Sequence, residues 1–220
     1  MFKHILMSVL LLSSASTWAT GQMGESIEFE GKNYYTHGFP PLDSKIPHGR
    51  GGCTALWRGY LGSWVIADRQ LYLKQVITHL PTAEPNPLFE KLEKSDNHCA
   101  GDYQIDLEKI YGHKAPIPAT WFTGYLALND GERLEYVHMG FASTYERNIL
   151  LHFKNGRLTQ KTVTDNTASF KKCGSVSKQF GEFYETNQQK PVAQQVNPDT
   201  WKPTPECASK VILDEQYSAQ

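Results

Sequence analysis

The residues of this chain best suited to acid–base or ion-pair chemistry are an arginine, a histidine and a glutamate. Arg58 opens a predicted hairpin, His138 lies in a β-prone run, and Glu146 follows a loop of small residues. An imidazole can act as a general base only where other polar groups converge on it. Tertiary folding would have to bring the three together, so a small hydrolase-type enzyme that uses them is one functional hypothesis.

Strand parity gives His138 a structural role instead. In an extended run over residues 133–139 it lies on the same face as Leu134 and Tyr136. Glu135 points to the opposite face. We therefore expect a buried histidine held by a hydrogen bond, rather than a general base or a metal ligand.

Arg58 falls on the same strand face as Tyr60 and Trp64, so it needs a carboxylate partner if it is buried. Glu146 and Glu135 are the candidate partners, and such a pair is more often structural than catalytic. Tyr145 and Glu146 follow a loop of small residues after a strand. That place suits a binding site, but an ordinary hairpin connection explains it equally well.

Aromatic residues support a second and preferred hypothesis, a non-enzymatic binding or envelope-associated module. Five of them cluster near the starts of the two strongest hairpins: Trp57, Tyr60, Trp64, Trp121 and Tyr125. They could line a face that binds a protein or a small apolar or aromatic ligand, and they could equally be core. A broad exposed aromatic patch would favour the binding module, and a deep polar pocket would favour the enzyme.

The sequence contains none of the motifs that identify common catalytic or cofactor sites. It has no Gly-x-Ser-x-Gly, no His-Glu-x-x-His, no dinucleotide fingerprint and no acidic calcium loop. We therefore predict no catalytic residue, metal or cofactor. Without Lys3 in the leader, 21 Lys and Arg face 23 Asp and Glu, a net charge of −2. That balance argues against a nucleic-acid partner.

Residues 1–19 have the pattern of a secretory signal peptide. A positive start is followed by an apolar run over residues 5–12, interrupted only by Ser8, and by small residues up to Ala19. A membrane-spanning helix needs about 20 apolar residues, so this run is too short. We expect a periplasmic or secreted protein whose mature part, residues 20–220, is one domain without a transmembrane segment.

The four cysteines predict two disulfides, because an even count is typical of exported proteins. Three connectivities are possible. We favour the sequential one, Cys53–Cys99 with Cys173–Cys207, because the second bridge would tether an otherwise loose tail.

Hairpin signals predict the fold. Asn155-Gly156 between two β-prone runs is typical of a type I′ turn, and its register places Leu151 opposite Gln160. Residues 54–78 form a second hairpin that turns at 67–70, with Gly59 and Gly62 marking bulges or close packing. Residues 27–36 form a third, and the run before His138 is expected to turn at 129–132.

These hairpins predict a mainly β protein, an antiparallel sandwich or partly open barrel with two or three short helices. Residues 86–92 and 105–111 are the helical candidates. Residues 188–205 are rich in Pro and Gln and are expected to extend over the surface.

Several motifs together resemble an uncharacterised group of bacterial β-rich proteins. They are Trp57-Arg-Gly-Tyr60, Trp121-Phe-Thr-Gly124, Leu134-Glu-Tyr-Val-His-Met-Gly140 and Ser143-x-Tyr145-Glu146, and the resemblance covers about residues 54–166. It implies a shared fold. It implies no activity and assigns no catalytic residue.

Overall fold

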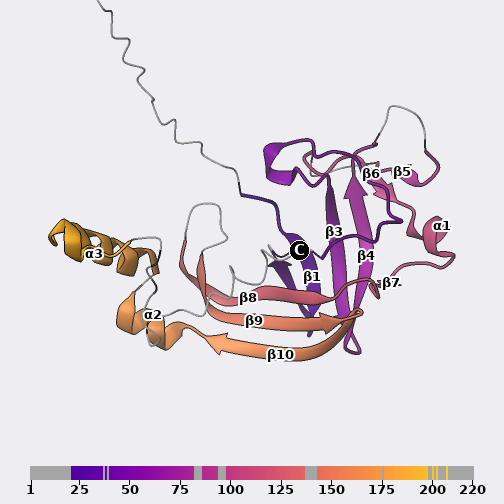
Figure 1. Cartoon of the computed structure of the whole chain (residues 1–220). Helices are drawn as coiled ribbons and strands as arrows, with labels where there is room; N and C mark the ends of the chain where they lie inside the picture. The colour runs from indigo at the N-terminus through magenta and orange to yellow at the C-terminus, as the bar shows by residue number, and fades with distance from the viewer. Residues whose placement is uncertain are drawn as a thin grey trace, which may run out of the picture.

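The chain is organised around one ten-stranded mixed sheet that is nearly closed into a barrel (Figure 1). The computed structural model describes residues 21–36, 38, 40–81, 86–93, 98–136, 143–174, 176–197, 200, 202 and 207. Seven strands follow the order β2-β1-β3-β4-β10-β9-β8; β6 and β7 also pair with β4, and β5 pairs with β6. The predicted class, mainly β with a partly open barrel and short helices, is confirmed.

The strands range in length from two residues in β7 to twelve in β8. In chain order they are β1 (Glu25–Phe29), β2 (Lys32–Thr36), β3 (Tyr60–Ala67), β4 (Gln70–Thr78), β5 (Phe89–Lys91), β6 (Tyr103–Ile105), β7 (Ile117–Pro118), β8 (Gly124–Glu135), β9 (Thr144–Lys154) and β10 (Arg157–Asp165). The helices are η1 (Thr54–Leu56), α1 (Leu107–Tyr111), α2 (Thr167–Cys173), α3 (Val176–Gln188) and η2 (Val192–Gln194).

Side chains bridge the two edge strands of the barrel, β2 and β8. Thr36 Oγ1 donates a hydrogen bond of 2.9 Å to the carbonyl of Ala127, and Lys32 Nζ lies 3.3 Å from Asp130 Oδ1. The sheet is mixed rather than purely antiparallel, because β1 runs parallel to β3 while it pairs antiparallel with β2. β1 therefore lies between β2, its hairpin partner, and β3, which begins more than 30 residues later in the chain.

The hairpin predicted within residues 54–78 is present as β3 and β4, and it supplies much of the core. Trp64 and Leu73 are fully buried on the inner face, and the reversal takes place at Asp68 and Arg69, both with positive φ. A bulge between Ser63 and Trp64 shifts the register by one residue. As a result Val76 lies in the core, where uninterrupted alternation from Leu71 and Leu73 would place Ile77.

The predicted turn at Asn155-Gly156 is present, with φ of 50° and 75°. The predicted pairing of β9 with β10 beyond this turn is wrong by one residue, because Leu151 pairs with Lys161 rather than with Gln160. The cause is a bulge at Thr159, whose hydroxyl bonds to the ring and the carbonyl of the neighbouring strand's His152. β10 pairs with β4 only through Arg157, so most of its second edge is exposed.

The predicted turn at residues 129–132 is also wrong, since β8 continues through it as one strand. Gly131 adopts a φ of 82° and forms part of a bulge. The bulge shifts the pairing of β8 with β9 but does not reverse the chain. Asp130 pairs with Arg147 across the ladder at 2.8 Å, which favours continued pairing of β8 with β9.

One of the two predicted helices is present, and the other is not. Residues 107–111 form α1, which Asp106 caps at its start and Gly112 at its end. Residues 86–92 instead carry the short strand β5, because Asn86 accepts a hydrogen bond from the Leu88 amide and turns the chain. α2 and α3 were not expected, and in Figure 1 they lie to one side of the barrel.

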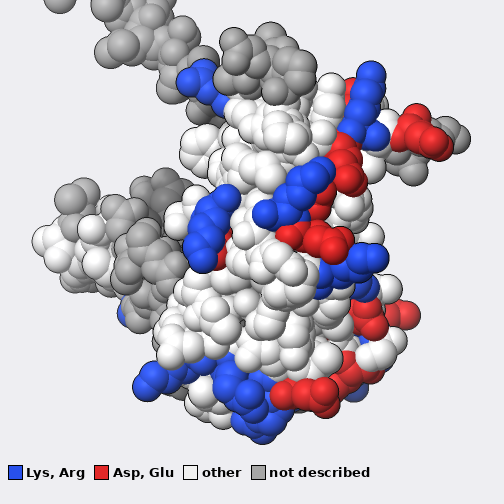
Figure 2. Space-filling view, turned by 90° about the vertical axis from the view of Figure 1, so that its right-hand side faces the viewer, with Lys and Arg blue, Asp and Glu red and all other residues white. Residues whose placement is uncertain are grey.

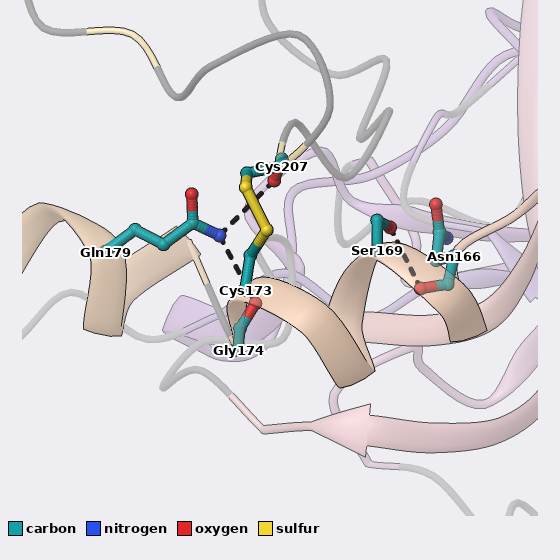
Figure 3. Close-up of a disulfide and its surroundings, with 6 residues drawn as sticks. All are labelled: Asn166, Ser169, Cys173, Gly174, Gln179 and Cys207. Atoms are coloured by element: carbon teal, nitrogen blue, oxygen red, sulfur yellow. Dashed lines mark hydrogen bonds between the residues drawn. A yellow bond between two sulfur atoms is a disulfide. The ribbon is translucent and has the colours of Figure 1, made fainter.

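The four cysteines pair sequentially, Cys53 with Cys99 and Cys173 with Cys207, which is the connectivity favoured above. The second bridge joins the end of α2 to the C-terminal segment (Figure 3). Gln179 of α3 lies against it and donates hydrogen bonds to the carbonyls of Gly174 and Cys207, at 3.3 and 3.2 Å. No described helix is both long and apolar enough to cross a bilayer.

Replacing Gly156 with Ala tests the packing of the β9–β10 turn. An added Cβ would lie 2.5 Å from the carbonyl oxygen of Ala119 and would also contact the Gln70 side chain. We expect unfolding free energy to fall by about 2–4 kcal/mol, from left-handed strain plus overpacking. Gly112→Ala is the matched control, because Gly112 has the same φ of 75° and an added Cβ there meets nothing within 4 Å. Equal losses in urea unfolding would contradict the tight turn packing.

The two disulfides are expected to stabilise different parts of the chain. Cys53 and Cys99 lie 46 residues apart and join segments next to β3 and β6. Replacing both with Ser should cost about 3–4 kcal/mol of barrel stability. The Cys173→Ser and Cys207→Ser pair should change the barrel transition by less than about 0.5 kcal/mol, since no described strand packs extensively on α3. A similar loss from both double variants would show that α3 is part of the barrel's cooperative unit.

Candidate functional site

The first strand of the barrel places a carboxylate inside the core. In β1, Glu25 alternates in phase with Ile27 and Phe29, and all three are buried. Glu25 has no exposed surface at all. A buried carboxylate requires hydrogen-bond donors and a counter-charge, because its desolvation is otherwise costly.

Three donors from the β3 segment satisfy Glu25. The indole Nε1 of Trp64 donates to one carboxylate oxygen, and Arg58 Nε donates to the other at 3.3 Å. The backbone amide of Gly62 adds a third bond. Gly62 is required here, because a Cβ would lie 2.6 Å from the indole nitrogen and 2.7 Å from the carboxylate. Glu25, Arg58 and Trp64 are called the Glu25 cluster below.

The electrostatics of the Glu25 cluster follow from its burial. Loss of solvent raises the pKa of Glu25 from 4.5 to about 7, although the Arg58 charge and the hydrogen bonds act in the opposite direction. Burial also lowers the pKa of Arg58 and raises that of Tyr60 to about 12. The arrangement can hold or release a proton near neutral pH, and it fastens β1 to β3.

The outer face of the same strands carries a shallow groove of about 370 Å³. Seven of its eight lining residues are polar: Ser26, Glu28, Asn33, Ser63, Trp64, Lys74, Gln75 and Gln104. Successive residues of a strand point to opposite faces, so the alternation that buries Glu25 and Trp64 turns Ser26 and Ser63 outward. This feature is called the outer groove below.

Strand register aligns the polar side chains of the outer groove in one row. Ser26 of β1 is opposite Ser63 of β3, which is opposite Gln75 of β4. The two serine hydroxyls are hydrogen-bonded at 3.2 Å, and Gln75 donates to Gln104 of β6. On the other side Ser26 pairs with Tyr35 of β2, whose ring is 73% exposed.

Charge in the outer groove is balanced. Lys74 Nζ of β4 reaches across β3 to Glu28 Oε2 of β1 at 3.0 Å, and both side chains are about half exposed. Asn33 of β2 is opposite Glu28 and completes the lining on that side. The arrangement therefore offers hydroxyls, amides and one neutralised ion pair to a ligand.

Arg58 does not have the partner that the sequence analysis expected. It is bonded to Glu25 and to the carbonyl of Met23 at 2.9 Å. Glu146 lies on β9, where its carboxylate accepts from the amide of Glu132 at 3.1 Å and lies 3.7 Å from Arg147. The predicted pairing of Arg58 with Glu146 or Glu135 is therefore replaced by a pairing with Glu25.

Tyr145 and Glu146 lie within strand β9, which begins at Thr144. The carbonyl of Tyr145 accepts a bond of 3.0 Å from the Asn166 side chain, which joins β9 to the start of α2. His138 lies outside the described residues. Tyr136, with which it was expected to share a buried face, is 59% exposed.

The five aromatic residues of the sequence-based binding hypothesis divide between interior and surface. Tyr60 and Trp64 are core residues, whereas Trp57 is 78% exposed. Trp121 is half-buried, stacks on Tyr111 and donates its indole N–H to the Pro41 carbonyl. Tyr125 is half-buried and stacks on the His152 ring at 4.4 Å. Only Trp64 of the five belongs to both the Glu25 cluster and the lining of the outer groove.

Sequence reasoning missed Glu25 and most of the outer groove. A signal for Glu25 was present, since the run Glu25–Phe29 places a carboxylate in phase with apolar residues. The outer groove had no such signal. Its serines and amides come from five strands, and only the parallel pairing of β1 with β3 brings the two serines side by side.

The described surface is mixed in charge. In Figure 2 basic and acidic side chains lie next to one another across the face shown. Within the described part of the chain, no three His, Cys, Asp or Glu side chains converge in a way that could hold a metal ion. The chain matched no protein-family model, no curated protein and no solved structure.

A pH titration of stability tests the Glu25 cluster. From pH 4.5 to about 7 the folded protein keeps a proton on Glu25 that the unfolded chain has lost. Wild-type stability relative to Glu25→Gln should therefore decrease as pH rises through this window. The measurement is urea unfolding of both proteins across it.

Asp130→Asn is the matched control for that titration. The hydrogen bond from Arg147 lowers the pKa of Asp130 below 3.8, so its stabilisation is lost only at more acidic pH. The difference between this variant and the wild type should stay level over the window. Parallel curves for wild type and Glu25→Gln would contradict the buried, proton-holding carboxyl.

Proposed function

We propose that this protein is an exported, non-enzymatic binding module, and that its ligand lies in the outer groove. One observation carries the proposal: register aligns polar side chains of four barrel strands in one open row. A paired sheet is a rigid platform, so these side chains are pre-organised for a ligand and lose little freedom on binding.

The electrostatic arrangement supports binding rather than catalysis. The carboxyl with a pKa near neutrality, Glu25, is fully buried and points away from the outer groove. Within the groove, Glu28 is engaged by Lys74. A general acid or base must come within hydrogen-bond reach of the substrate, and Glu25 cannot do so from the barrel interior.

Export is supported by the covalent chemistry of the chain. All four cysteines are paired in disulfides, which persist in oxidising compartments such as the periplasm or the extracellular space. β1 begins only a few residues after the expected signal cleavage site near residue 20. An exported binding module with this architecture would meet its ligand in the cell envelope or outside the cell.

The proposal is tested by filling the outer groove. Purified protein is immobilised on a sensor, and macromolecular fractions from the producing cell's envelope and culture medium are passed over it. Wild type should retain material from at least one fraction. Ser63→Arg places a long charged side chain in the middle of the row and should reduce retention about tenfold or more.

Thr162→Arg is the control, because Thr162 is exposed on β10, outside the lining of the groove. It should bind like wild type, and thermal melting should show that both variants are folded. The retained material should be recovered chemically unchanged after prolonged contact. Retention that Ser63→Arg leaves intact, or a product that accumulates with time, would overturn the proposal.

A further inference from the structure

We propose that the ligand of the outer groove is a linear, uncharged oligosaccharide; this rests on the proposed function and specifies its ligand class. Three independent features of the groove favour such a ligand over other polymers. They are the kind of hydrogen-bonding groups it offers, the exposed ring at its end, and its charge.

The hydrogen-bonding groups suit a ligand rich in hydroxyls. Serine hydroxyls donate and accept, and carboxamides present a donor and an acceptor side by side. Ser26, Ser63, Gln75 and Gln104 present these groups in a continuous row. The hydrogen bonds within the row, Ser26 to Ser63 and Gln75 to Gln104, fix the orientations of these side chains. Their remaining donor and acceptor positions can bind sugar hydroxyls.

Tyr35 provides a stacking surface at one end of the row. It is directly opposite Ser26 on the edge strand β2, and its ring is the most exposed tyrosine of the described chain at 73%. The negative face of an aromatic ring attracts the polarised C–H bonds on one face of a sugar. An exposed tyrosine in line with hydroxyls and amides is therefore a suitable end platform for a pyranose ring.

The length of the row also suits a chain ligand. From Tyr35 through Ser26 and Ser63 to Gln75 the row crosses three inter-strand spacings, roughly 14 Å at about 4.8 Å each. Gln104 on β6 extends it by one more strand. A ligand that runs across the strands would place successive sugar units over successive side chains.

The charges that line the outer groove disfavour an anionic polymer as its ligand. The one lysine of the lining, Lys74, is paired with Glu28. A polyanion would need unpaired Lys or Arg side chains to replace its counterions. A neutral saccharide needs none.

A peptide ligand is disfavoured by the backbone and by the lining. An extended peptide binds by adding to a free sheet edge, but β1 is paired with β2 and β3, and β3 with β1 and β4. A peptide docked on side chains alone would need apolar pockets for its anchor residues. The lining supplies polar groups apart from Trp64, whose side chain is buried.

The experiment uses the retained fraction and defined probes. Before it is passed over the sensor, the fraction is treated with periodate, which cleaves vicinal diols of sugars, or with a broad-specificity protease. Short linear oligomers of β-1,4-linked glucose of different lengths, whose units carry vicinal diols, are titrated separately by calorimetry. Periodate should abolish retention, protease should leave it intact, and at least one oligomer should bind.

Variants locate the sugar on the row. Tyr35→Ala should weaken binding about tenfold and Tyr35→Phe by less than about threefold, because the ring rather than the hydroxyl makes the contact. Gln75→Leu should weaken it about tenfold, since it removes both amide groups. Tyr184→Ala on α3 is the matched control for loss of an exposed tyrosine ring and should bind like wild type.

The outcomes separate this inference from the function on which it rests. Retention that survives periodate and is lost after protease would overturn the saccharide and leave a binding module for proteins. Failure of untreated fractions to bind at all would overturn the proposed function itself. Equal binding by Tyr35→Ala and wild type would contradict the placement of a sugar ring at Tyr35.

Discussion

The structure depends on the way one short strand, β1, is held between β2 and β3. Its inner face carries Glu25, which is fastened to Arg58 and Trp64, and its outer face carries Ser26 and Glu28. A slip of one residue in β1 would exchange these faces, exposing the apolar residues and burying Ser26. The buried carboxylate therefore specifies the register of β1. That register in turn decides which side chains of β1 line the outer groove.

This dependence joins stability to the proposed binding. Removing one member of a buried ion pair leaves the other uncompensated, at a cost of about 3–5 kcal/mol. Gly62 contributes by leaving room for the indole and the carboxylate. The regular alternation of β3 beside it lets Trp64 bond to Glu25 inside while Ser63 faces the groove. A change at Glu25 inside the barrel can therefore alter the outer face through β1 alone, without direct contact between Glu25 and the residues that line the groove.

Local patterns predicted the hairpins but not the way they assemble. Asn155-Gly156 predicted its turn because both residues tolerate positive φ, and strand alternation placed Tyr60 and Trp64 on one face, which is buried. The errors came from bulges, at Thr159 and Gly131, where a single residue changes the register without a clear signal. The groove could not be predicted, because it needs a parallel pairing between strands far apart in sequence. Glu25 could have been found from its phase with Ile27 and Phe29.

The most direct test of this account is to locate the ligand on the folded protein. Isotopically labelled protein would be titrated with oligosaccharides released from the producing cell's envelope, and backbone and side-chain amide shifts followed by NMR. The account predicts that the largest shifts fall on Tyr35, Ser26, Ser63 and Gln75, with the Gln75 and Gln104 carboxamides moving together. Shifts concentrated on β8, β9 and the segment between them, with the row unmoved, would contradict it.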